Sequence, residues 1–241
     1  MLKKFFRNII LREKASSDKF VSHLRRIGVT LGENVKFYSP STTLIDISAP
    51  YLLSIGNDVR VTHGVIILTH DYAWSVLKKH PQFKGRILGA QSPVKIGNNV
   101  FLGMNSIITR GITIGDNVII GVGSVVTKDC ESDSVYAGNP ARKIMSIDEY
   151  RQKREFLQFE EAKTLAIEYL ARFGKSPPIE IFKEYFMLFC DSKTASQIPA
   201  FKAQMCTSLN FEDSVAYMDN HKPLFEDYES FLNACYKDAL L

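Results

Sequence analysis

The residues of this chain best suited to chemistry are a histidine and the carboxylates near it. His70 closes the stretch ILTH and is followed at once by Asp71, while Asp46 stands further back in the chain. Near neutral pH a neutral imidazole can take a proton from a hydroxyl or an amine. A carboxylate bound to its other ring nitrogen would fix the tautomer and so support this role. The sequence therefore predicts His70 as a general base, with Asp46 or Asp71 as its orienting carboxylate.

The segment that must position His70 has a sequence pattern that repeats every six residues. Each hexad begins with an aliphatic residue, and the residue after it is usually small. A helix would need apolar residues three and four apart, and an amphipathic strand would need them two apart. A period of six instead predicts a short strand and a tight corner, stacked in coils of three hexads with the first residue facing inward. The first positions are Ile55, Val61, Ile67, Ile96, Leu102, Ile108, Ile114, Ile120 and Val126.

The repeat fails directly after His70, which marks that corner as a candidate binding edge. Hexad spacing is lost between Tyr72 and Gln91, and we expect a protruding loop over residues 72–92. When the coils are laid over one another, His70 falls at a corner, where later coils have Gly111 and Asp129. A histidine at a corner is not a core residue, so it is free to meet a ligand.

The position of Asp46 depends on how the first coil is folded. That coil, which begins at Leu31, is one hexad longer than the others. If the hexad APYLLS bulges outward, Asp46 lies beneath His70, about one strand spacing of ~4.8 Å away. If APYLLS forms an ordinary side of the prism, Asp46 lies at a different corner and Asp71 is the remaining candidate.

The stretch IGNNVFLGMNSIITRGITIGDNVIIGVGSVVTKD, with VYAGNPARKI after it, resembles the hexapeptide-repeat acyltransferases. Among these the resemblance is closest to the maltose/galactoside and capsule or exopolysaccharide O-acetyltransferases, and it covers about Leu31–Ile144. It implies a left-handed parallel β-helix and a homotrimer with the active site at the subunit interface. It also implies direct transfer of an acetyl group from acetyl-CoA to a sugar hydroxyl of a polysaccharide or its precursor. In that family the histidine after such an ILT run is the catalytic base, which matches His70.

The resemblance further implies a groove for acetyl-CoA between two subunits, with the GNPAR stretch beside the nucleotide end. Small residues admit the thin pantetheine arm, and cations suit the phosphates. The residues expected to bind acetyl-CoA are Phe101, Gly103, Ser106, Gly121, Ser124, Lys128, Asn139, Arg142 and Lys143. Those expected to bind the carbohydrate acceptor are Ser41, Thr42, His63, Asp71 and Trp74. No metal is expected, since the four cysteines are scattered without metal-ligand spacing.

The ends of the chain carry a different, helical pattern. Residues 1–27 alternate basic and apolar side chains and predict an amphipathic helix that caps the prism of residues 28–145. Weak contact of this helix with an anionic membrane surface is the alternative. Residues 146–241 predict an α-helical extension that opens with a capping box of Ser146 and Glu149. Further helices are expected over IEIFKEYFMLFC and FEDYESFLNACYKDALL, around a less regular stretch from Lys193 to Lys222.

Composition limits the remaining possibilities. The chain of 241 residues is 45% hydrophobic and 23% charged, with a net charge of +4, as in ordinary soluble globular proteins. We expect a cytoplasmic protein, peripheral at the inner face of the membrane if the first helix binds there, with no nucleic acid partner. An amino-sugar N-acetyltransferase is the closest alternative. A metal-dependent hydratase would need three converging histidines, and a non-catalytic, trimeric sugar-binding scaffold would bind no acetyl-CoA.

Overall fold

The computed structural model describes residues 11–237. The chain divides into two compact units, Met1–Tyr150 and Arg151–Leu241, and each is described by itself. No helix of the described residues is long and apolar enough to span a membrane.

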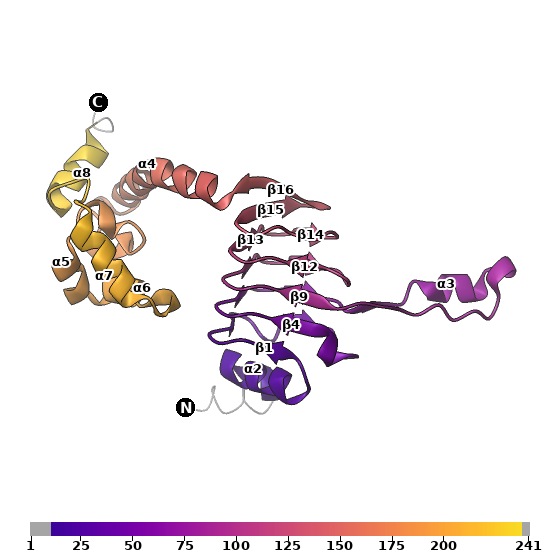
Figure 1. Cartoon of the computed structure of the whole chain (residues 1–241). Helices are drawn as coiled ribbons and strands as arrows, with labels where there is room; N and C mark the ends of the chain where they lie inside the picture. The colour runs from indigo at the N-terminus through magenta and orange to yellow at the C-terminus, as the bar shows by residue number, and fades with distance from the viewer. Residues whose placement is uncertain (1–10, 238–241) are drawn as a thin grey trace. The chain divides into compact units, whose positions relative to one another are not determined.

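The first unit is a stack of coils whose sides form three parallel sheets (Figure 1). One side consists of β1 (Thr30–Leu31), β4 (Leu53–Ile55), β9 (Val94–Ile96) and β12 (Thr113–Ile114). The second consists of β2 (Lys36–Phe37), β5 (Arg60–Val61), β10 (Phe101–Leu102), β13 (Val118–Ile120), β15 (Ser134–Gly138) and β16 (Ala141–Ser146), the last pairing antiparallel. The third consists of β3 (Leu44–Ile45), β6 (Ile66–Ile67), β11 (Ile107–Ile108) and β14 (Val125–Val126). The predicted β-helix of stacked coils is confirmed.

The aliphatic first residue of each hexad builds the core. All nine predicted first positions are at most 3% exposed. Burying an aliphatic side chain of this size contributes about 1.5–3 kcal/mol to folding. The repeated aliphatic residues therefore stabilise the stack of coils, whose sides we call the wall. At the corners, asparagine and aspartate adopt positive φ values and join successive coils through side-chain ladders, as where Asn99 donates to Asn117 at 2.9 Å.

The long first coil divides its extra hexad between two corners. Leu31 pairs with Ile55 and Phe37 with Val61, a separation of 24 residues, whereas Ile45 pairs with Ile67, a separation of 22. Two surplus residues therefore lie before β3, and four lie after it, around the 3-10 turn η2 (Pro50–Leu52). The outward bulge expected at APYLLS is confirmed in part: Pro50–Leu52 lie outside the strands as η2, whereas Leu53 and Ser54 of that hexad belong to β4.

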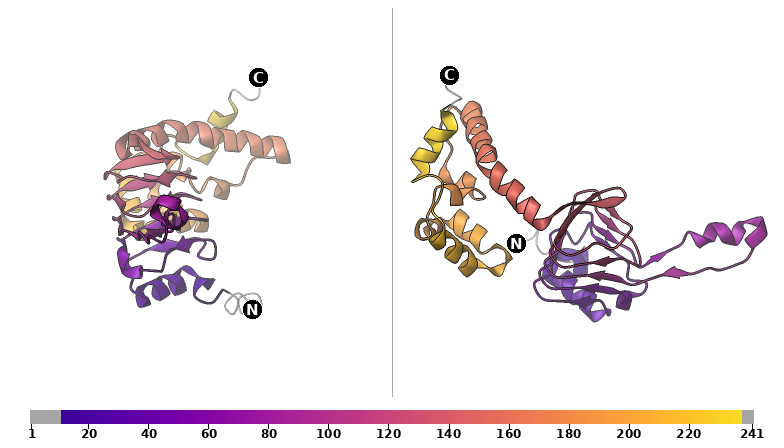
Figure 2. Two further views of the ribbon diagram at one scale, coloured as in Figure 1. Left: turned by 90° about the vertical axis from the view of Figure 1, so that its right-hand side faces the viewer. Right: turned by 45° about the horizontal axis from the view of Figure 1, so that its top comes forward.

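The predicted protruding loop is an arm that leaves the coil between β6 and β9. Its two strands, β7 (His70–Asp71) and β8 (Ala90–Gln91), pair antiparallel at the root. Beyond them lie the short helix α3 (Trp74–Lys79) and the 3-10 turn η3 (Pro81–Phe83). Figures 1 and 2 show the arm projecting away from the coils, and its helix buries no residue.

A helix covers the first coil, as expected. Within the described part of the N-terminal segment, a 3-10 turn (η1, Arg12–Ala15) precedes α2 (Ser17–Arg26), and the Ser16 side chain caps α2. Phe20 is buried edge-on against Phe37 of the first coil, with ring centroids 4.9 Å apart. The apolar residues on which membrane contact depended, Leu2, Phe5, Phe6, Ile9 and Ile10, lie outside the described residues.

The second unit is helical. The helix α4 (Ile147–Phe173) enters it from the end of the first unit and starts with the predicted capping box. Glu149 N–H donates to Ser146 Oγ (3.1 Å), and Ser146 N–H donates to the Glu149 carboxylate (2.6 Å). The remaining helices are α5 (Ser192–Gln197), α6 (Pro199–Met205), α7 (Phe211–Asn220) and α8 (Tyr228–Tyr236).

Two expectations for the helical unit were wrong. The segment IEIFKEYFMLFC forms two 3-10 turns, η4 (Ile179–Phe182) and η5 (Phe186–Leu188), instead of one helix. Its aromatic residues pack into the core, where Phe182, Phe186 and Phe189 are buried. The stretch expected to be less regular holds α5, α6 and α7, and a further 3-10 turn, η6 (Thr207–Leu209).

Candidate active site

Asp46 is buried between the first and second coils and is surrounded by hydrogen-bond donors. It follows β3, where its N–H donates to Ile67 C=O (2.9 Å), and its side chain is only 4% exposed. Its Oδ1 accepts from the N–H (3.0 Å) and hydroxyl (2.7 Å) of Ser48. Its Oδ2 accepts from the N–H (3.0 Å) and hydroxyl (2.7 Å) of Thr69 and from the ring of His70. The surplus residues in the first coil bring Asp46 to this corner.

These donors keep Asp46 ionised. Burial alone opposes the charge, but hydrogen bonds from His70, Thr69 and Ser48 outweigh it and hold the pKa of Asp46 well below its usual range. An ionised carboxylate only accepts hydrogen bonds, so the nitrogen of His70 that faces it must carry the proton.

His70 lies against this carboxylate through Nδ1, which is 2.5 Å from Asp46 Oδ2. Ser48 Oγ lies 3.2 Å from the same nitrogen. Because Nδ1–H donates to Asp46, the lone pair of the neutral ring is on Nε2. The side chain of His70 remains 40% exposed, so this nitrogen is accessible to a substrate. The pair has the arrangement of a general base oriented by a carboxylate.

Asp71 is engaged elsewhere and does not orient His70. Its Oδ2 accepts from Arg110 Nε (2.8 Å), and its Oδ1 accepts from Ala73 N–H (2.8 Å) at the start of the arm. The Arg110 hydrogen bond, more than any other contact, lowers the pKa of Asp71. Of the two carboxylates that the sequence left open, the structure places Asp46 against the ring of His70.

A hollow of about 260 Å³ opens beside the pair and is lined by Leu68, His70, Asp71, Thr109 and Arg110. The hollow lies where the arm leaves the coil, and it therefore brings together the predicted base and one predicted acceptor residue, Asp71. Arg110, Thr69 and Ser48 were not predicted. Arg110 could have been noticed because it falls at the corner level with the ILTH stretch in the next coil.

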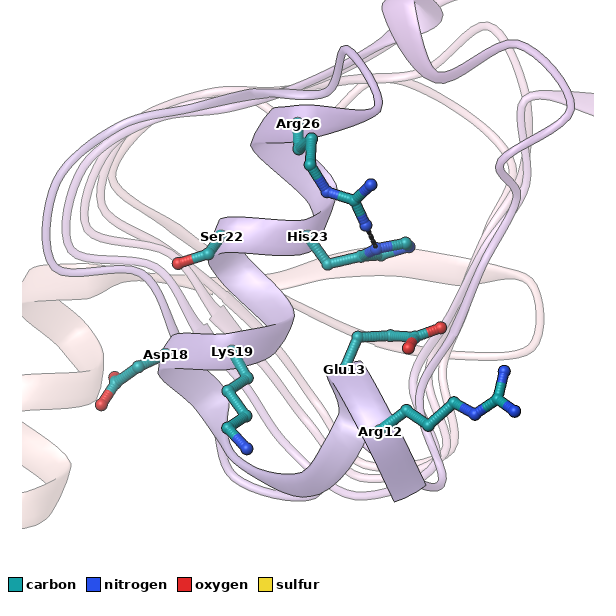
Figure 3. Close-up of a pocket in the computed structure, with 7 residues that line it drawn as sticks. All are labelled: Arg12, Glu13, Asp18, Lys19, Ser22, His23 and Arg26. Carbon is teal, nitrogen blue, oxygen red and sulfur yellow. Dashed lines mark hydrogen bonds between the residues drawn. The ribbon is translucent and has the colours of Figure 1, made fainter. Parts of the chain in front are cut away.

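A larger hollow of about 520 Å³ lies at the N-terminal end of the chain, on α2 and η1 (Figure 3). Arg26 lies beside His23 there, with Nη2 2.9 Å from Nδ1. The lining mixes cations with Glu13 and Asp18 and includes none of the predicted site residues. We assign no chemistry to it.

Two of the residues expected to bind acetyl-CoA are corrected by the structure. Ser106 and Ser124 are fully buried, because the fifth position of each hexad points into the prism as the first does. Ser124 Oγ accepts from Gly138 N–H (3.2 Å), and Ser106 Oγ is buried with no hydrogen-bond partner. Their side chains therefore cannot line an external groove.

The glycines expected in that groove have a structural reason to be glycine. A Cβ on Gly103 would stand 2.6 Å from Ile120 C=O in the next coil, and one on Gly121 would stand 3.0 Å from Ala137 Cβ. Close stacking of the coils thus requires Gly103 and leaves little room at Gly121.

The remaining residues expected at the donor are mostly exposed. Phe101 points outward from β10 and is 42% exposed. Asn139 and Arg142 lie at the hairpin between β15 and β16, and Lys128 lies beyond β14, all of them exposed. Lys143 is instead tied to Glu131 (3.0 Å), which raises its pKa.

The residues expected at the acceptor do not all come together. Thr42 Oγ1 lies 3.3 Å from His63 Nδ1 and accepts from Gly64 N–H (3.1 Å). These three residues lie at the corner between the second and third sides, and Ser41 beside them is exposed. Trp74 belongs to the arm, where it packs on Tyr72 with ring centroids 4.8 Å apart.

Cys130, the cysteine of the coils, does not have the surroundings of a nucleophile. Cys130 is buried there, and burial raises the pKa of its thiol to about 12. Among residues 11–237, no group of three or more histidine, cysteine, aspartate or glutamate side chains could hold a metal ion.

Comparison with known proteins identifies the family to which the chain belongs. A family model described as the hexapeptide repeat of succinyl-transferase matches residues 93–128. Protein CapG of Staphylococcus aureus is 45% identical over 155 residues, which cover 63% of this chain and 83% of that protein. The chain belongs to the hexapeptide-repeat acyltransferase family.

This acyltransferase is also similar to solved structures. A maltose O-acetyltransferase from Clostridium difficile 630 is 30% identical, with a TM-score of 0.39 over 59% of this chain and 81% of that one. A galactoside acetyltransferase in complex with coenzyme A is 26% identical, with a TM-score of 0.43 over 63% of this chain and 82% of that one. Family membership rests on the similarity to CapG.

Proposed function

We propose that this acyltransferase transfers the acetyl group of acetyl-CoA to a hydroxyl of a sugar, in a polysaccharide or its precursor. The observation that carries the proposal is the His70–Asp46 pair, which leaves an accessible basic nitrogen at the edge of an open hollow. Family membership supplies the class of reaction, and the hollow supplies a place for the acceptor.

The proposed chemistry is a direct transfer. His70 Nε2 takes the proton of the acceptor hydroxyl while the hydroxyl oxygen forms a bond to the thioester carbonyl carbon. The carbon–sulfur bond breaks, and the leaving thiolate recovers the proton from His70. Asp46 stabilises the imidazolium that exists between the two proton transfers, because it is ionised and faces the other ring nitrogen. No acyl-enzyme is needed, in keeping with the buried thiol of Cys130.

The exposed cations at the far end of the coil fit the phosphates of acetyl-CoA. Lys128 and Arg142 are exposed, and Asn139 stands beside Arg142 at the tip of the hairpin. Lys143 would have to leave Glu131 before it could contribute. Phe101 offers an exposed ring for the donor or the acceptor. We propose these contacts on a left-handed coil, the hand that the family implies.

We further propose a cytoplasmic homotrimer with each site at the boundary of two copies. The outward residues of the third side, Leu44, Ile66, Ile107 and Val125, are all aliphatic, which suits a side covered by another copy. The arm also presents Val76, Leu77, Ile87 and Leu88 as exposed apolar side chains. Sedimentation analysis should give three times the chain mass of 27.3 kDa, and a monomer at micromolar concentration would contradict this part of the proposal.

The function is tested by offering sugars and nucleotide sugars to the enzyme with acetyl-CoA and following free thiol. We expect thiol release that depends on the sugar and is lost in His70→Ala. Treatment of the product with hydroxylamine then distinguishes an ester, which is cleaved, from an amide, which is not. A stable amide product would show an amino-sugar N-acetyltransferase instead.

A further inference from the structure

The arm and the coil beyond it carry positive charge without any negative charge. From Tyr72 to Gly115 the sequence has no aspartate or glutamate, although Asp71 and Asp116 stand at either end. The same stretch contains Lys78, Lys79, Lys84, Arg86, Lys95 and Arg110. A run of this length with cations alone creates a local positive field, which attracts anions and is not explained by folding.

Four of these cations lie on the arm itself. Lys78 and Lys79 end α3, Lys84 follows η3, and Arg86 lies in the returning segment between η3 and β8, all four exposed. Among the described residues, none of the four is paired with a carboxylate. Their charges are therefore available to a ligand along the length of the arm.

The four arm cations together with Arg110 form what we call the cationic strip. Arg110 extends it to the corner of the coils at which His70 lies. Its guanidinium is fixed at the Nε edge by Asp71 (2.8 Å), and the residue lines the same hollow as His70. A guanidinium held at one edge still presents its two terminal nitrogens as a fork, which suits a carboxylate or a phosphate. An anionic group bound there would lie within the hollow that His70 lines.

Aromatic side chains stand at the root of the arm, next to His70. Tyr72 is exposed, and Trp74 packs against it edge-on, with an angle of 63° between the rings. Such rings combine an apolar face with a polar edge, a combination that suits the mixed surface of a sugar ring.

We propose that the acceptor is an acidic glycan, whose carboxylate or phosphate groups are bound by Arg110 at the corner and by the four arm cations further out. The glycan chain runs along the arm, and one sugar at the root presents its hydroxyl to His70. This rests on the proposed function and names its class of substrate. An anionic lipid surface explains the arm cations less well, because the cationic strip begins in the catalytic hollow and passes an aromatic pair.

The test uses the whole enzyme and a defined probe, the hexasaccharide of galacturonic acid, with its fully methyl-esterified form as the neutral control of equal length. Binding is measured by calorimetry and acetyl transfer by thiol release. The variant Lys78→Gln/Lys79→Gln/Lys84→Gln/Arg86→Gln removes the arm charges. A matched variant removes four exposed lysines of the helical unit: Lys183→Gln/Lys193→Gln/Lys202→Gln/Lys222→Gln.

We expect the wild type to bind the acid at least about tenfold more tightly than the ester, with the preference weakening as salt rises. The arm variant should lose most of this preference, raising the KM for the acid about tenfold to a hundredfold, while the helical-unit variant keeps it. Arg110→Gln should raise the KM for the acid more than it lowers kcat. A phosphorylated maltohexaose, measured alongside, separates phosphate from carboxylate recognition.

Three results would overturn the proposal. The first is equal binding of acid and ester by the wild type. The second is an arm variant that loses binding to phosphatidylglycerol vesicles and keeps the preference for acidic glycans, which would make the arm a lipid contact. The third is an arm variant that changes only the oligomeric mass, which would make it a contact between copies. Transfer to a neutral sugar in any of these cases would leave the proposed function standing.

Discussion

The corner after β6 and the corner after β11 are built on the same wall but lead to different structures. After β11 the chain turns within Thr109–Ile112 and enters the next strand at Thr113, whose N–H is satisfied by Asp129 of the coil above (2.8 Å). After β6 the chain instead opens into the arm and does not rejoin the wall until Val94. The strands and the buried aliphatic residues are the same in both coils, so the core does not distinguish them.

The difference shows where such a fold can place chemistry. Along the sides, backbone groups are used in the ladders and inward side chains fill the core, which leaves little freedom. At the open corner, His70 is released from the core, and the long first coil places Asp46 beneath it. The regular corner stabilises the wall, and the irregular one carries the candidate site.

Of the substitutions that test this difference between the two corners, replacement of the base should have the largest effect. His70→Ala should lower kcat/KM by about 10²–10⁴-fold, because proton removal from the acceptor is lost. The variant should still fold, with a moderately lower melting temperature because the buried Asp46 carboxylate loses one hydrogen-bond donor. His221→Ala in the helical unit serves as the control and should keep full activity. Full activity in the His70 variant would refute the assignment of the base.

Asp46→Asn should have the next largest effect. An amide can donate to Nδ1 and so favour the wrong tautomer, and we expect kcat to fall by about 10²-fold or more. Asp71→Asn should leave the pH profile of kcat/KM in place, since that carboxylate contacts Arg110 and not the histidine ring. If the two variants shifted the profile equally, Asp46 would not be the orienting residue.

The wall itself can be tested at a glycine. Gly103→Ala forces a Cβ to within 2.6 Å of the Ile120 carbonyl oxygen, and overpacking of this kind costs about 1–3 kcal/mol. Gly89→Ala on the arm meets no atom within 4 Å and should cost nothing measurable. Urea unfolding of both variants gives the difference in free energy, and equal stability would show that the coils can separate at no cost.

The smallest effect concerns pH. The folded pKa of Asp46 is depressed, so its ionisation contributes stability above its ordinary pKa of 3.8, and this contribution is lost as the pH falls below that value toward the folded pKa. The stability gap between the wild type and Asp46→Asn should therefore shrink as the pH falls below about pH 4. Denaturant titrations at pH 5 and pH 3 measure it, and a gap that widened over this range would contradict the sign.

Much of the wall could be predicted from the sequence, because one period dictates both burial and pairing. The period assigned the first positions correctly, and its failure after His70 marked the arm. The period could not show how the extra residues of the first coil are distributed between two corners. The residues before Leu44 and after Ile45 carry no hexad signal. The buried serines were missed for a related reason: Ser106 and Ser124 occupy inward positions that hold valine in other coils.

The helical unit shows the opposite case. A capping box and a long apolar pattern were enough to predict α4. Short helices such as α5 and α6, of six and seven residues, lack the length for a periodic signal and form because Ala195, Phe201 and Met205 pack into a common core. Arg110 was missed because a single arginine at a corner carries no periodic pattern, although its position level with the ILTH stretch of the preceding coil was visible in the sequence.

The placement of α2 has a consequence for solubility. The first coil ends in β1, β2 and β3, whose outer backbone groups could pair with any passing strand and let copies join end to end into fibres. Phe20 and Leu24 seal the core at that end, and the Ser17 hydroxyl accepts from Phe37 N–H (3.0 Å), which occupies one of the outer donors. A truncated chain that lacks α2 would thus expose a template for its own aggregation, and the helix serves as much to prevent growth of the stack as to stabilise it.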